Sequence, residues 1–383
     1  MPKAISLTEA IVTRVENWLF QSAMPLWCAQ GITAHGLAVE ELDFSGQPKD
    51  VGYHRTMVQF RQIHCLAMAS LAGHADPRLA HNLFDRVTQS AWHRGGGWVH
   101  RLDCGGKILD DTREACDQAF ALLATASVFN CTDDKGVLDK AHATLEFLDR
   151  EMSDANDGFR EAIPYRLPRR QNAHMHFLEA FLALYEVTED RRFLERAEDM
   201  IALLTERFVD GRGFLHECFD ANWARNAAEE IEPGHHFEWV WLLSEYARLS
   251  DAPVPGLARN LFLSATRYGI DGNGLAVAKI NSRGEICDDT KMLWAQTEML
   301  KAHIARAEHA KEDHDVAIAR IVGQLFAHFL LAAPAGIWHE KLDTQGAPID
   351  TRMPASTFYH LTGAFMELLR FRGRMPRLLA RHA

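Results

Sequence analysis

Two short segments of the sequence pair a histidine with a glutamate three residues later. His176 precedes Glu179, and His235 precedes Glu238; this spacing places both side chains of a pair on one face of a helix. A third histidine, His360, follows another expected helix start. Because histidine titrates near neutral pH, such residues can both take and give a proton. A single buried histidine is more often a packing residue, but the recurrence favours an acid–base site.

An arginine lies inside an apolar stretch further upstream. Arg61 is flanked by Phe60 and Ile63, and if it faces inward it needs an anionic or hydroxyl-rich partner. A guanidinium can stabilise the oxyanion that develops when a proton leaves the carbon beside a carbonyl. An exposed arginine on the polar face of the helix explains the pattern equally well. The same expected helix also carries His54. Asp117 lies on another expected helix, and an isolated aspartate there is more often a helix cap or a member of a structural ion pair than a catalyst.

Tryptophans gather near the expected hairpins and helix starts. Aromatic rings interspersed with polar groups suit the apolar faces and the hydroxyls of a sugar. Filling the gaps between helices is the competing role for many of these rings. The tryptophans concerned are Trp98, Trp223, Trp239, Trp294 and Trp338.

Other chemistries lack their sequence motifs. The sequence has no Gly-x-Ser-x-Gly elbow, no Walker loop, no nucleotide fingerprint and no cysteine nucleophile with a local signature. His174 and His176 point roughly 160° apart on a helix, so they are unsuited to hold one metal ion together. We therefore predict a site without metal or cofactor. A glycoside hydrolase would need paired carboxylates, but it would leave the histidines without a role. Its candidates are Asp110, Asp111, Asp288, Asp289 and Glu238.

One short pattern occurs three times along the chain. It runs Asp103-x-x-Gly106-x-x-x-Asp110-Asp111-Thr112, and it recurs from Asn281 and from Asp343. The Asp or Asn with a Gly three residues later suits a tight hairpin turn, and the terminal Asp-Thr suits a helix N-cap. The copies lie 178 and 62 residues apart. This spacing indicates units of about 60 residues, and hence about six units in the chain.

Helical periodicity dominates the sequence. We expect one domain over residues 1–383, built from about twelve helices in six pairs. Six hairpin-linked pairs can close into an (α/α)6 barrel whose even-numbered helices line the inside, so that polar residues at their starts converge on one pocket. An open superhelix is the alternative. The expected helices span residues 6–30, 54–74, 77–93, 113–130, 135–151, 171–187, 189–209, 232–250, 253–269, 289–309, 312–332 and 355–372.

The composition argues against several classes of partner. The 383 residues carry a formal net charge of −11, so no basic surplus is available to neutralise nucleic acid or an anionic membrane. We expect no signal peptide and no membrane span. The seven cysteines are scattered and odd in number, which favours reduced thiols in the cytoplasm. A monomer or a homodimer is compatible with the sequence.

Several segments, taken in order over nearly the whole chain, resemble the N-acylglucosamine 2-epimerase superfamily, which includes cellobiose 2-epimerases, mannose isomerases and sulfoquinovose isomerases. The resemblance implies the closed (α/α)6 barrel, an enzyme that acts on a sugar, and no obligatory metal. The matching segments are Arg61, Asp117-Gln118-Ala119-Phe120-Ala121-Leu122, Asn172-Ala173-His174-Met175-His176-x-x-Glu179-Ala180, Pro233-Gly234-His235-x-Phe237-Glu238-Trp239 and Tyr359-His360.

The resemblance also implies a role for each catalytic residue. His176 would help to open the pyranose ring, and His360 would take the C2 proton to form a cis-enediol that is reprotonated at C1. His235, supported by Glu238, would be the second acid–base residue, and Arg61 would hold O1 and O2. In an epimerase, His235 and His360 would instead act on opposite faces of C2. Further expected substrate contacts are Asn172, Glu179, Asp117, Trp294, Trp98 and His54.

Within the family, the segment around Asn172 is most similar to the aldose–ketose isomerases. We therefore expect interconversion of D-mannose and D-fructose, with D-lyxose and D-xylulose as a side reaction and a sugar 2-epimerase as the alternative. Compact hairpins favour a monosaccharide. Basic residues beyond Arg55 and Arg61 do not gather near the helix starts, which disfavours a sugar phosphate. Cys116, where the family pattern suggests Tyr, and His339 depart from that pattern. A glycosidase and a non-catalytic sugar-binding module remain as rivals.

Overall fold

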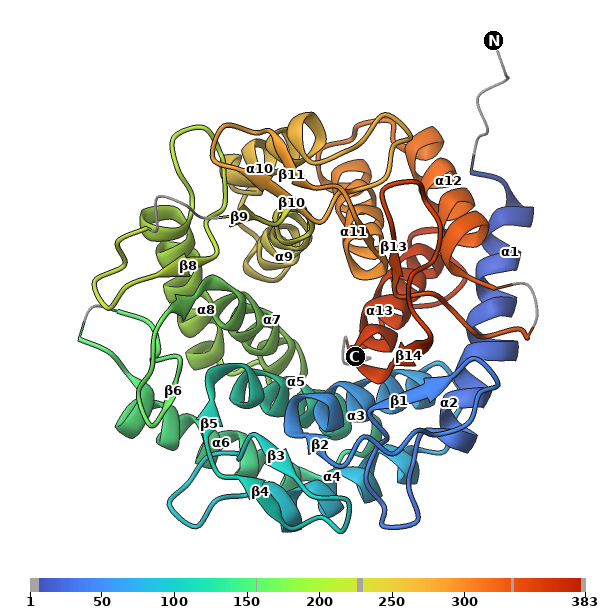
Figure 1. Cartoon of the computed structure of the whole chain (residues 1–383). Helices are drawn as coiled ribbons and strands as arrows, with labels where there is room; N and C mark the ends of the chain where they lie inside the picture. Colours follow the sequence, from blue (N-terminus) through green and yellow to red (C-terminus); the bar gives the residue numbers. More distant parts are fainter. Residues whose placement is uncertain (1–6, 156, 226–229, 332–333, 380–383) are drawn as a thin grey trace.

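The helices form a closed ring of two layers, as Figure 1 shows for the computed structural model of the chain. The structure describes residues 7–155, 157–225, 230–331 and 334–379. Each inner helix contacts the next, and the last inner helix contacts the first. The predicted (α/α)6 barrel is therefore confirmed, and the open superhelix is not formed. The inner helices are α3 (Thr56–Leu71), α5 (Ala115–Thr132), α7 (Gln171–Thr188), α9 (Pro233–Ser250), α11 (Leu293–His309) and α13 (Ala355–Phe371).

The outer layer consists of amphipathic helices that cover the inner ring. In α4 the buried residues include Ala80, Leu83, Phe84 and Val87, which follow the i, i+3, i+4 spacing of one helix face. Inner helices are instead buried on nearly all sides, because they face both the outer layer and the barrel interior. The outer helices are α1 (Glu9–Trp18), α2 (Met24–Gln30), α4 (Pro77–Ala91), α6 (Leu138–Phe147), α8 (Arg191–Leu203), α10 (Gly256–Tyr268) and α12 (Asp315–Gln324).

An isolated β-bridge follows the outer layer in each of the six units. The bridges confirm the predicted period, because their first residues lie about 60 residues apart, at Ile32, Trp92, Ser153, Val209, Ile270 and Leu330. A side chain from the following inner helix holds most of these turns. In the second unit Gln118 accepts a hydrogen bond from the backbone N–H of Trp98 and donates one to its carbonyl. In the third unit His174 accepts the corresponding bond from the N–H of Phe159.

The repeated turn has the geometry that its sequence predicts. Asp103 accepts hydrogen bonds from the backbone N–H groups of Gly105 and Lys107, and Gly106 adopts a φ of 86°, which glycine tolerates best. The N-cap prediction for the end of the pattern is wrong. Asp110 accepts a bond from the N–H of Thr112, but a short strand, β5 (Arg113–Glu114), still separates this turn from α5. A further copy of the pattern, from Asp43 to Asp50, forms the same turn.

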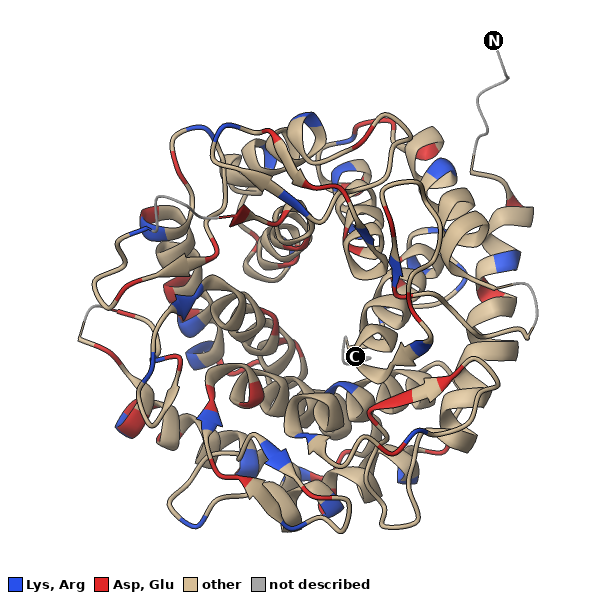
Figure 2. Cartoon of the chain, in the orientation of Figure 1, with Lys and Arg blue, Asp and Glu red and all other residues tan. Residues whose placement is uncertain are grey.

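Short antiparallel strands connect neighbouring units at the end of the barrel where the inner helices begin. The pair β1–β14 connects the first unit with the last and so closes this layer. Figure 2 shows acidic and basic residues around the whole ring of hairpins.

Among the described helices, none is long and apolar enough to cross a membrane. The strands are β1 (Glu41–Asp43), β2 (His54–Arg55), β3 (Arg101–Leu102), β4 (Ile108–Asp110), β5, β6 (Ala162–Ile163), β7 (Arg169–Arg170), β8 (Cys218–Phe219), β9 (Glu230–Ile231), β10 (Lys279–Asn281), β11 (Ile286–Asp288), β12 (Lys291–Met292), β13 (Lys341–Leu342) and β14 (Arg352–Pro354).

Most of the strand pairings between units bring a hairpin residue against the first turn of the preceding inner helix. The backbone N–H of Gln171, the first residue of α7, donates to the carbonyl of Glu217. In the same way the N–H of Leu293, which begins α11, donates to the carbonyl of Glu340. Hairpin carboxylates are thereby placed beside the helix starts that the sequence predicts to form the site.

Candidate active site

A cavity of about 860 Å³, including its open mouth, lies where the inner helices begin. All five predicted catalytic residues line it, together with Asn172 and Trp294. Hairpin residues complete its wall. The lining residues are Arg61, Arg170, Asn172, His176, Glu217, Cys218, Glu232, His235, Glu238, Trp294, Glu340, Ser356, Thr357 and His360.

His360 is held as a neutral imidazole. Its Nδ1 lies 2.8 Å from Oε1 of Glu298, and burial lowers the pKa of His360 to about 4 despite that carboxylate. A neutral ring that donates its Nδ1–H to Glu298 keeps a lone pair on Nε2. His360 therefore has the protonation state of a general base.

Arg61 lies beside this base. Its Nη1 is 3.4 Å from Nε2 of His360 and donates to the carbonyl of Ser356 at 3.1 Å. The guanidinium also lies over the ring of Phe120, 4.3 Å from the centroid, and near that of Tyr359 at 4.9 Å. These contacts fix the positive charge next to the reacting atoms by cation–π attraction and hydrogen bonding.

His235 is held in the opposite protonation state, and a hairpin carboxylate contacts its ring. Burial disfavours a charged ring, but Glu217, whose Oε2 lies 3.0 Å from Nδ1, together with Glu232 and Glu238, raises the pKa of His235 to about 10. The carboxylate in contact with the ring is therefore that of Glu217, whereas Glu238 adds to the raised pKa of His235, and its predicted support of His235 stays a prediction. Asn172 contacts the other ring nitrogen, Nε2, at 3.2 Å.

His176 and Glu238 form the deeper part of the wall. Nδ1 of His176 lies 3.2 Å from Glu179 and 3.9 Å from Glu238. Burial lowers the pKa of His176 to about 4. Burial also raises the pKa of Glu238 to about 8, and the nearby Glu298 carboxylate adds to this effect. A neutral histidine next to a readily protonated carboxyl can pass a proton in either direction.

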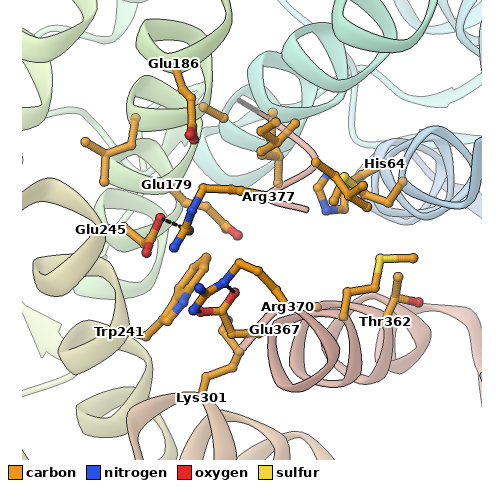
Figure 3. A pocket seen from close by; sticks show the side chains of 18 of the residues that line it. His64, Glu179, Glu186, Trp241, Glu245, Lys301, Thr362, Glu367, Arg370 and Arg377 are labelled. Carbon is orange, nitrogen blue, oxygen red and sulfur yellow. Dashed lines mark hydrogen bonds and ion pairs between the residues drawn. The ribbon is translucent and has the colours of Figure 1, made fainter. Parts of the chain in front are cut away.

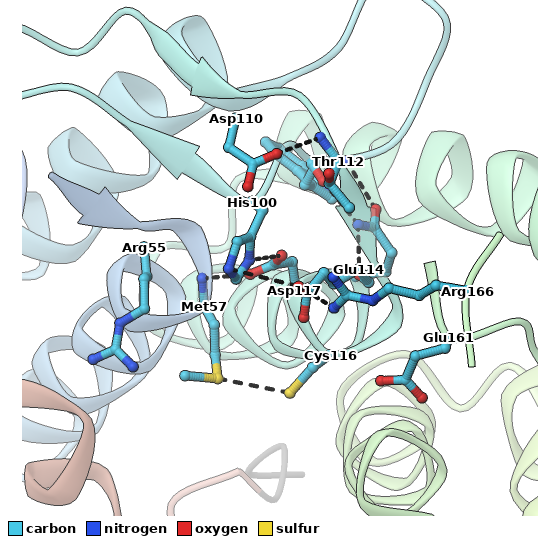
Figure 4. Close-up of polar contacts among 12 residues, drawn as sticks. Arg55, Met57, His100, Asp110, Thr112, Glu114, Cys116, Asp117, Glu161 and Arg166 are labelled. Carbon is cyan, nitrogen blue, oxygen red and sulfur yellow. Dashed lines mark hydrogen bonds and ion pairs between the residues drawn. The ribbon is translucent and has the colours of Figure 1, made fainter. Parts of the chain in front are cut away.

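Four predicted substrate contacts do not line the cavity. Trp98 is fully buried between layers, where its indole N–H donates to Thr144 at 2.9 Å. His54 lies in β2 opposite Leu102. Asp117 accepts hydrogen bonds from the ring of His100, at 3.0 Å, and from the N–H of Met57 (Figure 4).

Glu179 is the fourth predicted substrate contact that does not line the cavity. It contacts other residues of the site instead. Besides contacting His176, it accepts a hydrogen bond from the hydroxyl of Tyr359. It lines a second cavity on the rear side of the barrel. Its contacts make it a positioning residue for His176. Neither departure from the family pattern, Cys116 or His339, lines the active cavity.

Sequence reasoning missed Glu217, Glu298, Glu340 and Arg170 as site residues. Glu340 accepts a hydrogen bond from the hydroxyl of Thr357 at 2.5 Å, and burial raises its pKa to about 7. Glu298 shares the i, i+3 spacing with Lys301 on α11, which could have marked it. The hairpin residues carry no comparable local signal, because strand pairing between units places them.

Three groups of described side chains have the spacing of a metal-binding set: His100 with Glu114 and Asp117, His176 with Glu179 and Glu238, and Glu238 with Glu298 and His360. Basic side chains already neutralise carboxylates in two of them. Arg166 contacts Glu114, and the ammonium of Lys301 lies 2.8 Å from Glu298. Such contacts disfavour an added cation. The absence of a metal requirement stays a prediction.

Comparisons with known proteins show the family and the fold of the chain. The family model described as N-acylglucosamine 2-epimerase matches residues 38–364. A protein of Rhizobium meliloti named mannose-6-phosphate isomerase is 34% identical over 372 residues, which cover 92% of this chain and 95% of that protein. The D-mannose isomerase of Thermobifida fusca is 29% identical over 340 residues, or 82% and 83% of the two chains. The structure of a cellobiose 2-epimerase from Bacillus thermoamylovorans shares the fold, with a TM-score of 0.86, 19% identity, and coverage of 95% of this chain and 100% of that one.

Proposed function

The chain belongs to the N-acylglucosamine 2-epimerase family, and on that basis we propose that it interconverts D-mannose and D-fructose. Membership makes it an enzyme of sugar isomerisation or epimerisation. The particular sugar, the reaction outcome and the role of each residue are our proposal. D-Lyxose and D-xylulose are the expected second substrate pair.

The pair of histidines in contact with Trp294 carries the proposal. The centroid of the Trp294 ring lies 4.9 Å from that of His235 and 5.8 Å from that of His360. The pKa of His235 is raised to about 10 and that of His360 is lowered to about 4. One site thus holds a protonated acid and a neutral base at the same pH, which is the requirement for moving a proton between neighbouring carbons.

The proposed reaction begins with opening of the pyranose ring, assisted by His176. Nε2 of His360 then removes the C2 proton of the aldose, and the electrons of that C–H bond form the C1–C2 double bond. O1 accepts a proton from His235, which gives the cis-enediol. In the second half, His360 returns its proton to C1 while the O2–H proton passes to His235, and O2 becomes the ketose carbonyl. Arg61 stabilises the charge on the oxygens during both transfers.

The charges at the cavity wall favour an uncharged sugar. Arg170 lines the cavity, but its guanidinium is paired with Glu161 at 2.5 Å and lies 3.7 Å from Glu114. Glu217 and Glu232 also line the cavity, and they would repel a phosphate. Mannose 6-phosphate is the second candidate substrate, because the relative from Rhizobium meliloti bears that name. A direct comparison of D-mannose with mannose 6-phosphate decides between them.

A 2-epimerase is the alternative reaction, and the same two histidines favour it as a second candidate. Both rings contact Trp294 and line the same cavity, so a sugar bound between them could lose a proton to one and regain it from the other. Inversion at C2 needs such access to both faces of the carbon. Isomerisation needs only one face, and a sugar held closer to His360 would give it.

The test is to incubate EDTA-treated protein with D-mannose in D2O and to follow the sugars by NMR. Fructose is the expected product, and it carries deuterium at C1 to the extent that the proton on His360 exchanges with D2O before it is returned. Glucose labelled at C2 without fructose would replace isomerisation by epimerisation. Faster conversion of mannose 6-phosphate than of mannose would overturn the choice of an uncharged sugar. No conversion of mannose, lyxose, glucose, cellobiose or mannose 6-phosphate would overturn the proposed function. The His360→Asn variant, which lacks the proposed base, is the negative control.

A further inference from the structure

Lys301 lies directly behind the proposed base, in the interior of the barrel. Its side chain is almost fully buried, and its Nζ is 2.8 Å from Oε2 of Glu298. The other oxygen of that carboxylate lies 2.8 Å from Nδ1 of His360. A direct chain of two polar contacts therefore connects an ammonium group to the catalytic ring. Lys301 itself does not line the active cavity; it lines the rear cavity that Figure 3 shows.

Charged groups from all the surrounding inner helices face Lys301. Burial disfavours its ammonium form, but the carboxylates of Glu298, Glu238 and Glu179 outweigh this effect and raise the pKa of Lys301. The ammonium also lies 3.8 Å from the ring centroid of Trp241, a cation–π contact. The groups that sense its charge are Glu298 on α11, Glu238 on α9, Glu179 on α7, Glu367 and His360 on α13, and His64 on α3.

The charge of Lys301 acts on both members of the His360–Glu298 pair in the same direction. Burial raises the pKa of Glu298, but Lys301 and His360 reverse that effect and lower it overall, so the carboxylate stays ionised. The same positive charge disfavours a second positive charge on His360. Without Lys301, both members of the pair would bind a proton more readily, so Nε2 would lose its lone pair at a higher pH than in the wild type.

We propose that Lys301 is a positioning residue, whose ammonium group orients the Glu298 carboxylate and thereby keeps His360 a neutral base. This inference rests on the proposed function only in taking His360 as the base, a role that isomerisation and epimerisation share. Lys301 does not line the active cavity and does not contact the proposed reacting atoms, so it acts entirely through Glu298.

The test compares Lys301→Met with Lys301→Arg, and Arg370→Met serves as the matched control. Arg370 is a basic residue on the same rear cavity, but its ion pairs are with Glu308 and Glu367. In Lys301→Met we expect kcat to fall about 100-fold with KM changed less than about threefold. The acidic limb of kcat/KM should move to higher pH by about one unit or more. Lys301→Arg should retain the wild-type limb, and Arg370→Met should lower only the Tm.

An unmoved acidic limb in Lys301→Met, or an equal movement in Arg370→Met, would overturn the proposal. If Lys301→Met does not fold, Lys301→Gln keeps a hydrogen-bond donor without the charge, and the same shift is expected of it. A second readout needs no turnover: in protein labelled with ¹⁵N-histidine, a pH titration followed by the His360 signals, assigned with His360→Asn, should show the ring gaining its proton at higher pH in Lys301→Met than in the wild type. A His360 ring that gains its proton at the same pH in the wild type and in Lys301→Met would refute the role of Lys301 even if no sugar were converted.

Discussion

Nδ1 of His235, on α9, lies 3.0 Å from Oε2 of Glu217, in the hairpin 18 residues earlier in the chain. Gln171 holds the carboxylate in place, because its backbone N–H donates to the Glu217 carbonyl and its side-chain amide donates to Oε2 at 2.8 Å. The start of α7 therefore orients the group that charges the histidine on α9. Protonation of His235 depends on contacts among three segments that are separate in sequence.

In Glu217→Gln, the loss of activity that occurs as pH rises should begin at a lower pH than in the wild type. The pKa of His235 is raised to about 10 chiefly by Glu217, so the acid form is lost only as pH rises through that value. Removing the carboxylate lowers this pKa, and we expect the basic limb of kcat/KM to move down by more than one pH unit. Glu40→Gln is the control, since Glu40 is the corresponding hairpin residue in the first unit but pairs with Arg55. A basic limb at the same pH in Glu217→Gln and the wild type would contradict the assignment.

Arg61→Lys should reduce kcat about 100-fold while leaving the protein folded. A lysine ammonium retains the charge, but it cannot lie over Phe120, bind the carbonyl of Ser356 and reach toward His360 at the same time. Steady-state kinetics with the proposed substrate measure the loss, and circular dichroism checks the fold. Activity within threefold of the wild type would show that only the charge matters.

His174→Gln should make the protein more resistant to acid. Burial lowers the pKa of His174 to about 4, below the ordinary value of 6.5. Between these values the unfolded chain binds more protons than the folded one, so stability is lost as pH falls from about 6.5 towards 4. Glutamine cannot be protonated, and Gln118 forms the same kind of contact in another unit. We expect a gain of about 2 kcal/mol at pH 5 relative to the wild type and little change at pH 7.

Urea unfolding at the two pH values measures this difference. An equal effect of His174→Gln at pH 5 and pH 7 would mean that the histidine is not held neutral in the folded protein.

Trp98→Phe should affect stability rather than catalysis. The residue lies outside the cavity and its indole N–H donates to Thr144, so the variant loses one buried hydrogen bond, worth about 1 kcal/mol. We expect a lower Tm with kcat and KM unchanged. Trp294→Phe, which alters a residue of the cavity wall, should raise KM instead. A raised KM in Trp98→Phe would place that tryptophan back among the substrate contacts.

The sequence was most informative where function depends on one helix. His176, His235 and His360 stand at helix starts with local spacing that can be recognised, and the ring of paired helices follows from a period of about 60 residues. The inward direction of Arg61 also agreed with its apolar surroundings. Local patterns therefore predicted the closed ring of inner helices and the five proposed catalytic side chains that line the cavity.

Contacts between units could not be predicted in the same way. The partner of His235 is set by strand pairing between β7 and β8, and no spacing within α9 indicates Glu217. Trp98 was predicted to contact the sugar because it is a large aromatic residue beside a hairpin. In the structure it is fully buried between the inner and outer helix layers, and no local pattern in the sequence indicates that packing. The prediction of a helix N-cap at Asp110 failed because the two-residue strand β5, which separates Asp110 from α5, has no sequence signature.

The ring closes between segments that lie about 300 residues apart. Arg61 stands on the first inner helix and His360 on the last, and their contact crosses the seam at which β1 pairs with β14. Such distant contacts form late, because a long chain must be ordered before they can be made. The base and its arginine are therefore expected to meet only in the final step of folding. We therefore expect a chain that is still emerging from the ribosome to form several helical pairs before Arg61 and His360 can meet.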